Sequence, residues 1–237
     1  MSSPDKPVLK VAPCDHAAAK YAVENWHYSG KLPSTLQKVF KIGAWENDVF
    51  VGCVVFGHGA NPSIGKPYGL TTFEVCELTR IALKKGHTAP VSRIVRIAMK
   101  LLKQQNQRLQ LIVSYADTGQ GHHGGVYQAG GWIYEGISKG QPSLMYNGRK
   151  WHAKALVTSH PNYDRKKAIK VDATDKHKYL MPLDEAMKRK VEPLRKPYPK
   201  RAGSSSVEHS DSIGEVGGSI PTPALNGSDV ETDGEQT

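Results

Sequence analysis

The sequence predicts an α/β protein, α+β in its detail, with one mixed central sheet and flanking helices. Two kinds of observation lead to this fold class. Apolar stretches with the length and β-branching of strands recur at residues 38–46, 49–57, 74–83 and 111–113. Between them lies an amphipathic segment, residues 91–104, whose apolar positions repeat at helical spacing. We therefore expect strands buried by helices packed on the sheet.

The charge of the chain is unevenly distributed. The net charge is +10, but from Gly203 onward there are seven acids and no Lys or Arg, which leaves about +17 on residues 1–202. So much positive charge favours a polyanionic partner, although a merely soluble basic protein is the alternative. We expect a folded domain over residues 1–158, a basic extension that packs on it or continues it over 159–202, and a disordered acidic tail over 203–237.

Composition also excludes several classes of protein. No apolar run approaches the roughly 20 residues of a membrane span, and the first ten residues lack the apolar core of a signal peptide. The three cysteines are odd in number and unclustered, which argues against a disulfide framework or a zinc site. We expect a cytoplasmic protein without a membrane partner.

The N-terminal part predicts a short strand at 8–12 and then a helix. Asp15 can cap that helix, and His27 and Tyr28 fall at its C-terminal end, facing a loop. Such a pair can serve a binding site, or Trp26 can be core and His27 a partner of the helix dipole.

Residues 36–56 predict a hairpin that turns at Asn47-Asp48. The Gly/Pro-rich loop that follows, GHGANPSIGKPYG, contains Tyr68 and is either a ligand-contacting surface or a tolerated insertion.

The strand at 74–83 carries two charged residues, Glu77 and Arg80. Charges inside a buried strand seldom persist without a partner or a ligand. Because residues three apart in a regular strand point to opposite faces, we expect the two not to pair with each other.

Pro90 suits the first turn of the helix at 91–104. Gly86 and the free N–H groups at this helix start, with Ser92 and Arg93, form a plausible anion site of the kind that holds a pyrophosphate.

The stretch from Leu111 to Gly136 is the most informative. A buried strand ends on Ser114, Tyr115 and Asp117, and open α/β sheets place their chemistry at such polar strand ends. The Gly-rich connector GQGHHGG then leads to a short helix and a second strand, Trp132-Ile133-Tyr134.

This order resembles the C-terminal half of the GNAT (N-acetyltransferase) fold, whose motif reads roughly Y-x-x-x-G-[FW]-x-x-x-G. Tyr127, Gly131, Trp132 and Gly136 fit the motif. The resemblance implies a sheet splayed between its fourth and fifth strands, coenzyme A phosphates near Gly86, and a tyrosine, here Tyr127, that donates a proton to the leaving group. The usual [QR]-x-x-G-x-[GA] is only loosely present, because its leading Gln or Arg is missing.

A longer series of motifs looks like the bacteriophage Mom family: YAVENWHYS, VGCVVFGHGA, PYGL, ELTRIAL, VSRI, SYAD and GHHGGVYQAGGWIYEG, over roughly residues 8 to 200. That family consists of distant GNAT relatives that add a carbamoylmethyl group to N6 of adenine in phage DNA, which blunts host restriction. The resemblance implies a transferase in the host cytoplasm that acts on double-stranded DNA.

The chemistry assigns roles to residues. Adenine N6 is a poor nucleophile, so transfer needs an activated donor and a group that removes a proton. We assign Asp117 to the N6 amine, Tyr127 to the leaving group and Arg80 to the donor or to charge stabilisation. His27, Tyr28, Tyr68 and Ser114 are assigned to substrate binding. The adenine must be flipped out of the duplex, at roughly a few kcal/mol, and Trp26, Tyr28 or Tyr68 can stack on it.

The donor is either an acyl-CoA or glycyl-tRNA. A carbamoylmethyl group has the atoms of a glycyl unit. Acyl transfer of glycine to N6, followed by attack of its free amine on purine C6, would give the product by rearrangement, which makes tRNA a second possible partner. Iron held by His27, Asp117, His122 and His123 is possible but not favoured, and we expect no metal.

Residues 159–201 hold thirteen Lys and Arg from Arg165 onward against five acids, with Tyr163, Tyr179 and Tyr198 among them. This composition fits a surface that follows DNA phosphates, or else a solvated extension. The segment KYLMPL predicts an edge strand.

Three alternative functions stay open. The first is an acetyltransferase with another amine substrate. The second is a methyltransferase that uses S-adenosylmethionine, although no [DN]-P-P-[YF] motif is present. The third is a non-catalytic DNA-binding protein. The oligomeric state is not predicted.

Overall fold

The computed structural model describes residues 7–32, 39–59, 61–140, 143–171 and 173–200. Its strands are β1 (Leu9–Pro13), β2 (Phe40–Glu46), β3 (Val49–Gly57), β4 (Val75–Leu83), β5 (Leu111–Asp117), β6 (Ile133–Ser138), β7 (Ser143–Tyr146), β8 (Arg149–His152), β9 (Ile169–Val171) and β10 (Lys176–Pro182). Its α-helices are α1 (His16–Trp26), α2 (Val91–Gln105), α3 (Gly125–Ala129), α4 (Ala153–Ser159) and α5 (Glu185–Val191). Short 3₁₀ helices are η1 (Lys66–Tyr68), η2 (Thr118–Gln120), η3 (Arg165–Lys167) and η4 (Glu192–Leu194).

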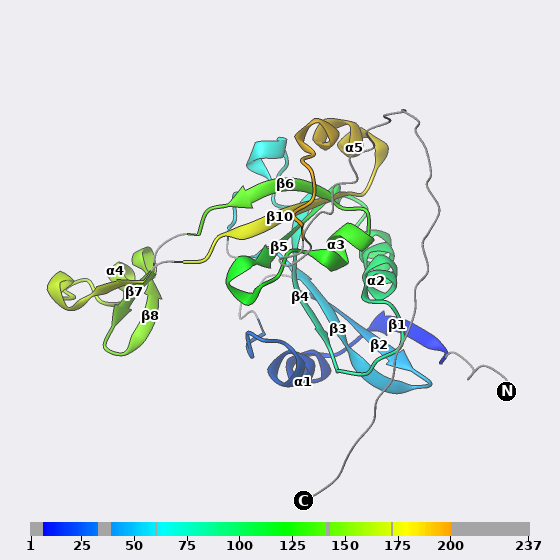
Figure 1. Cartoon of the computed structure of the whole chain (residues 1–237), viewed down its shortest axis with the longest axis horizontal. Helices are drawn as coiled ribbons and strands as arrows, with labels where there is room; N and C mark the ends of the chain where they lie inside the picture. The colour runs from blue at the N-terminus through cyan, green and yellow to red at the C-terminus, as the bar shows by residue number, and fades with distance from the viewer. Residues whose placement is uncertain (1–6, 33–38, 60, 141–142, 172, 201–237) are drawn as a thin grey trace, which may run out of the picture. The chain divides into compact units, whose positions relative to one another are not determined.

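Seven strands form the large sheet in the order β1-β2-β3-β4-β5-β10-β6 (Figure 1). Its pairs are antiparallel except for β4 and β5, which run parallel. That parallel ladder ends at Leu78 and Ser114, although β4 continues to Leu83 and β5 to Asp117. The two strands therefore separate beyond this point, which confirms the predicted mixed sheet splayed between its fourth and fifth strands.

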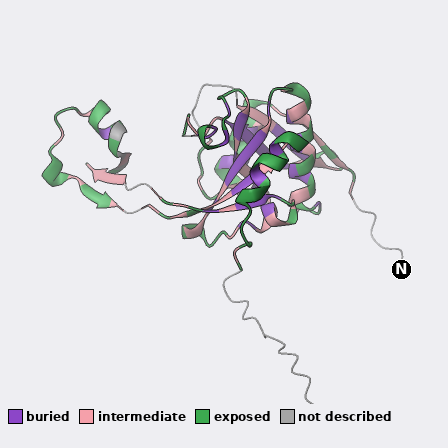
Figure 2. Ribbon diagram, turned by 90° about the horizontal axis from the view of Figure 1, so that it is seen from above, coloured by how far each residue is buried: buried purple, intermediate pink, exposed green. Residues whose placement is uncertain are grey.

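Helices cover both faces of the large sheet. On one face α2 and α3 bury an apolar cluster that includes Val54, Phe56 and Ile112. On the other face α1 packs on Cys53, Val55 and Ala82, and α5 packs on residues of β5 and β10. Figure 2 shows the buried residues concentrated in the strands between these helices.

Two local signals acted as predicted. The Asp15 side chain accepts a hydrogen bond from the Ala18 N–H at the start of α1. Asn47 and Asp48 both have positive φ, 48° and 62°, as the tight turn of a hairpin requires.

The segment KYLMPL forms a strand, but the prediction that this strand lies at the edge of the sheet was wrong. It forms β10, which lies between β5 and β6 and is therefore an interior strand, with Tyr179 and Leu180 fully buried. Adjacent apolar residues that are buried on both faces are what an interior position demands.

The chain between β6 and β10 forms a second sheet, in the order β8-β7-β9. Helix α4 lies between β8 and β9 in the chain, and its Leu156 is buried. The described residues belong to one unit, and the predicted boundary after residue 158 stays a prediction. The predicted tail, 203–237, lies outside the described residues. No helix in the described part of the chain has the length and apolar character that a membrane crossing requires.

Candidate active site

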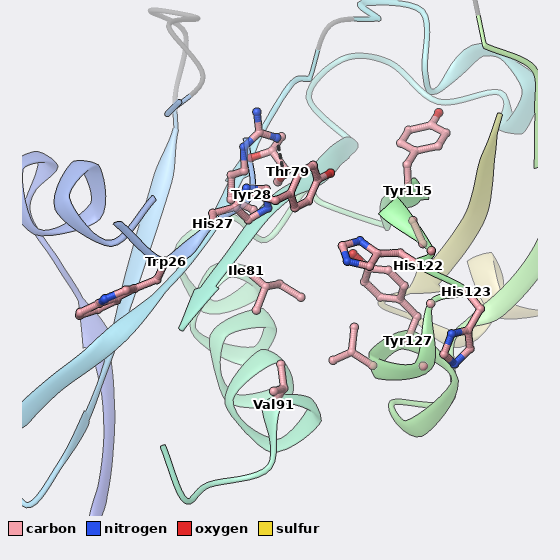
Figure 3. Close-up of a pocket in the computed structure, with 16 residues that line it drawn as sticks. Trp26, His27, Tyr28, Thr79, Ile81, Val91, Tyr115, His122, His123 and Tyr127 are labelled. Carbon is pink, nitrogen blue, oxygen red and sulfur yellow. Dashed lines mark hydrogen bonds between the residues drawn. The ribbon is translucent and has the colours of Figure 1, made fainter. Parts of the chain in front are cut away.

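A cavity of about 500 Å³ opens where β4 and β5 separate. Figure 3 shows its two walls: His27, Tyr28 and Ile81 on one side, His122 and Tyr127 on the other, with Val91 of α2 at the base. The lining residues are Trp26, His27, Tyr28, Thr79, Arg80, Ile81, Val91, Tyr115, Ala116, Gly121, His122, His123, Gly124, Gly125, Val126 and Tyr127.

His27 closes helix α1 and is held in one tautomer. The Ser29 N–H donates to its Nδ1 over 3.1 Å, so in the neutral ring the proton is on Nε2, which acts as a donor. Burial, followed by the electrostatic effects of the nearby Arg80 and His122, lowers the pKa of His27 to about 4. His27 is therefore neutral at pH 7.

Tyr28 stands at the rim of the cavity. Its ring lies 4.3 Å from the His27 ring and 5.3 Å from the His122 ring, between centroids, and 56% of the residue is exposed. Partial burial of the side chain raises the pKa of Tyr28, and the negative charge of Asp117 raises it further. A flat, partly exposed phenol with its neighbours fixed is suited to stack on a planar ring.

A β-bulge at Thr79 reshapes the middle of β4. Leu78 pairs with Phe56 while Arg80 pairs with Val55, so Thr79 is an extra residue in the ladder. The bulge reverses the alternation of side chains: Cys76, Leu78, Ile81 and Leu83 all join the cluster under α2.

Glu77 and Arg80 therefore project from the same face, and the prediction that they point to opposite faces was wrong. Arg80 donates to the carbonyl oxygens of Thr79 over 2.6 Å and Lys31 over 3.3 Å. These bonds fix the guanidinium on the same side of the cavity as His27.

The opposite wall contains a pair of buried hydroxyls. Ser114 Oγ lies 2.8 Å from both the Leu78 carbonyl oxygen and the Tyr127 hydroxyl. Because a serine has one proton and a carbonyl can only accept, Ser114 donates to Leu78 and the Tyr127 hydroxyl donates to Ser114. Burial raises the pKa of Tyr127 to about 12, which keeps it protonated.

The Gly-rich loop is fixed from β10. The Tyr179 hydroxyl and the Gln128 amide both donate to the His123 carbonyl oxygen. Gly124, with φ of 79°, lies so close to Tyr179 that a Cβ would come within 2.3 Å of its ring. Glycine at this position lets the loop lie on the tyrosine.

Asp117 and Tyr127 do not meet. Ser114 and Ala116 face Tyr127, whereas Tyr115 faces the other side of the sheet, and strand alternation places Asp117 with Tyr115. The Asp117 carboxylate accepts from the Gly119 N–H over 2.9 Å and the Thr174 hydroxyl over 2.6 Å. It does not line the cavity, although its charge acts on Tyr28.

Tyr68 also lies away from the cavity. It is 2% exposed, and its hydroxyl donates to Glu135 over 2.6 Å. Lys178 lies 2.9 Å from the same carboxylate. Because the ring of Tyr68 is enclosed, it cannot stack on the flipped adenine as we expected from the sequence.

The predicted pyrophosphate site is filled by a carboxylate. Glu46 accepts from the Thr88 N–H over 2.8 Å and from the Ala89 N–H over 2.6 Å. Gly86 has a positive φ, 81°, and Gly86, Ser92 and Arg93 do not line the cavity. An anion at this loop would have to displace Glu46.

The sequence of the whole folded part matches one family model. Residues 8–200 match the model of the Mom protein family. The chain belongs to the Mom protein family.

No curated protein matches this Mom-family chain. Solved structures similar to it include an acetyltransferase from Bacillus subtilis in complex with CoA (13% identity, TM-score 0.44, covering 76% of this chain and 100% of that one). Others are a GNAT family acetyltransferase from Elizabethkingia anophelis with acetyl-CoA bound (16%, 0.41, 74% and 98%) and a spermidine N-acetyltransferase from Vibrio cholerae (9%, 0.45, 76% and 97%).

The cavity of this Mom-family protein contains groups suited to group transfer. Tyr127 is a proton donor, His27 is a neutral hydrogen-bond donor, and Arg80 is a fixed positive charge. Transfer reactions need a proton for the leaving group and positive partners for the charge that develops. Among the described residues no group of three His, Cys, Asp or Glu side chains is placed to hold a metal ion.

Sequence reasoning left several cavity residues of this Mom-family protein without a role. Tyr115 was noted only as part of a polar strand end, and Ile81 and Val91 only as helix or strand residues. His122 and His123 were considered only as iron ligands, whereas the structure places them in the lining of the cavity. The signal that could have singled out Tyr115 is its position beside Ser114 at the end of a buried strand.

Proposed function

We propose that this protein transfers an acyl-type unit to the N6 amine of adenine in DNA and so forms N6-carbamoylmethyladenine, which protects phage DNA from host restriction. Membership of the Mom protein family supports this substrate. The observation that carries the proposal is the cavity at the separation of β4 and β5, with Tyr127 in one wall and His27 in the other.

The cavity suits a flipped base in size and lining. Its volume of about 500 Å³ lies within the usual range of small-molecule sites. Trp26, Tyr28 and Tyr115 offer aromatic surfaces, and base stacking on such rings contributes about 1–3 kcal/mol per base. That is comparable to the few kcal/mol that flipping an adenine costs.

The chemical roles follow from the hydrogen bonds. His27 donates from Nε2 to the donor's carbonyl oxygen, where negative charge builds as the amine attacks. Arg80, unlike the neutral His27, supplies a positive charge. Tyr127 turns the proton that it donates to Ser114 toward the leaving group and gives it up there, and the Ser114 hydroxyl can then donate to the phenolate oxygen. Asp117 holds the start of the loop that carries His122, through its bonds to Gly119 and Thr174.

Binding of DNA is attributed to the basic part of the chain. In the second sheet and α4, residues 143–171 contain seven Lys and Arg against one acid, Asp164. Arg149 lies 4.5 Å from the centre of the Trp151 ring. Cations interleaved with aromatic rings match a path of phosphates and bases.

The donor is an activated acyl unit, either acyl-CoA or glycyl-tRNA. Glu46 already holds the loop N–H groups where a pyrophosphate would sit, so an acyl-CoA would need another phosphate site or a shift of Glu46. Feeding doubly labelled glycine during modification separates the routes. Product that carries both glycine carbons and its nitrogen supports glycyl transfer, and product without the nitrogen excludes it.

The function itself is tested by mass spectrometry of nucleosides from the DNA of cells that express the chain. The expected result is N6-carbamoylmethyladenine. Methyladenine would point to a methyltransferase, and unmodified adenine would leave only a DNA-binding protein.

A further inference from the structure

One titratable group beside the cavity has no task in the proposed reaction. Glu77 of β4 pairs with Gly57 of β3 on one side and with Val113 of β5 on the other, and all three strands are interior to the sheet. Its exposure is intermediate. No hydrogen bond or ion pair joins its carboxylate to another described residue. A carboxylate enclosed by a sheet without such a partner is costly, and it persists where it has a use.

The bulge at Thr79 brings Glu77 toward the reacting groups. It places Glu77 and Arg80 on one face of β4, and Arg80 lines the cavity. Tyr115 lines the cavity from the same face of β5. Since Glu77 pairs with Val113, Tyr115 is its diagonal neighbour, a distance that an aromatic side chain can span.

The positive charges around Glu77 offset only part of the effect of its burial. Burial raises the pKa of Glu77, and the positive charges of Lys176 from β10 and Arg80 oppose the rise. Burial, followed by the charges of Glu77 and Glu135, raises the pKa of Tyr115 to about 12. From the loop after β3, Gly59 approaches so closely that a Cβ would lie 1.9 Å from Glu77 Oε2.

We propose that Glu77 is the final acceptor of the proton that the adenine amine releases, and that the Tyr115 hydroxyl carries the proton to it. This rests on the proposed function. As the bond from N6 to the acyl carbon forms, one N6 proton passes to the Tyr115 oxygen while the Tyr115 proton passes to Glu77. The bond from the acyl carbon to its leaving group breaks, and Tyr127 protonates that group. Glu77 and Tyr127 then return to their starting states by exchange with water.

Asp117 does not fit this role equally well. Its carboxylate oxygen already accepts hydrogen bonds from the Gly119 N–H and the Thr174 hydroxyl, which commit it to holding the loop. Glu77 has no such bonds among the described residues.

The test uses the purified full chain, a DNA duplex, and an extract of the host cell as the source of donor. The initial rate of modified adenine is measured by mass spectrometry across about pH 5 to 9. For the wild type the rate should rise with pH, with an inflection above the ordinary pKa of a glutamate, because Glu77 must be ionised to accept a proton.

Glu77→Gln keeps the shape and removes the base. The rate should fall by about 100-fold or more, and the rising limb of the pH profile should disappear. Glu77→Asp keeps a carboxylate and should retain part of the rate together with the limb. Tyr115→Phe should lose a similar factor, and the double variant Tyr115→Phe/Glu77→Gln should be no slower than the slower single variant, because both residues serve one transfer.

Glu135→Gln is the matched control. Glu135 also acts on Tyr115, but it is paired with Lys178 and Tyr68, so this variant should lose stability and keep the pH limb. A Glu77→Gln rate within about threefold of wild type, or a lower rate with the limb intact, would overturn the inference. A wild type that makes no modified adenine would instead refute the proposed function, and this inference with it.

Discussion

The Tyr127 hydroxyl lies 2.8 Å from Ser114 Oγ, and Ser114 in turn lies 2.8 Å from the carbonyl oxygen of Leu78. This chain of bonds links the helix after the Gly-rich loop to β5 and β4, just where the parallel ladder ends. The phenol that is proposed to protonate the leaving group is therefore fixed by the two strands whose separation makes the cavity.

Ser114→Ala should destabilise the fold and misplace the phenol. Ser114 is 0% exposed, and its loss leaves the Tyr127 hydroxyl and the Leu78 carbonyl without this partner. Leaving a buried donor unsatisfied costs about 1–3 kcal/mol. Urea unfolding measures the cost, and an unchanged midpoint would show that Ser114 does not hold the pair.

Asp117→Asn should retain product. The amide keeps an oxygen that can accept from the Gly119 N–H and the Thr174 hydroxyl, so the loop stays in place. Asp117→Ala removes both bonds, should cost about 1 kcal/mol, and should lower product by loosening the loop. Loss of product in the asparagine variant, with wild-type stability, would return Asp117 to the role of proton acceptor.

The stability of the protein should fall as His27 is forced to accept a proton. The pKa of His27 in the folded chain is about 4, below its ordinary value of 6.5. Between these values the unfolded chain binds a proton that the folded chain does not, so stability is full above pH 6.5 and declines as the pH falls toward 4. His27→Gln should flatten this part of the curve, measured as unfolding free energy against pH. An NMR titration of His27 that centres near pH 6.5 would contradict the buried, neutral ring.

Two glycines of the same loop should respond differently to a methyl group. Gly121 and Gly124 both have positive φ, 66° and 79°, so either alanine strains the backbone by about 1 kcal/mol. At Gly121 nothing lies within 4 Å of the added Cβ, whereas at Gly124 the Tyr179 ring lies 2.3 Å away. Gly124→Ala should therefore lose about 1–3 kcal/mol more than Gly121→Ala in thermal unfolding. Equal losses would mean that the loop does not lie on Tyr179.

Much of the fold could be predicted from local chemistry. Asp15 was recognisable as a helix cap and Asn47-Asp48 as a hairpin turn, because each acts within a few residues of itself. The start of α2 at Val91 followed from Pro90. His27, Tyr28 and Tyr127 were expected near a site, and the structure gathers all three around one cavity.

What could not be predicted depends on partners distant in the sequence. The bulge at Thr79 is set by pairing with β3, and it reverses the facing of Arg80 relative to Glu77. β10 enters the sheet between β5 and β6, which no local pattern specifies. Glu46 accepts from the N–H groups of Thr88 and Ala89, in the loop just before α2, from 42 and 43 residues away.

The most direct test of the central claim compares wild type with Tyr127→Phe by nucleoside mass spectrometry of DNA from the same host, with DNA affinity measured in parallel. The phenylalanine keeps the packing and removes the proton that the leaving group needs, so we predict N6-carbamoylmethyladenine in the wild type, a decrease of about 100-fold or more in the variant, and equal DNA affinity. Undiminished N6-carbamoylmethyladenine in Tyr127→Phe would contradict the account.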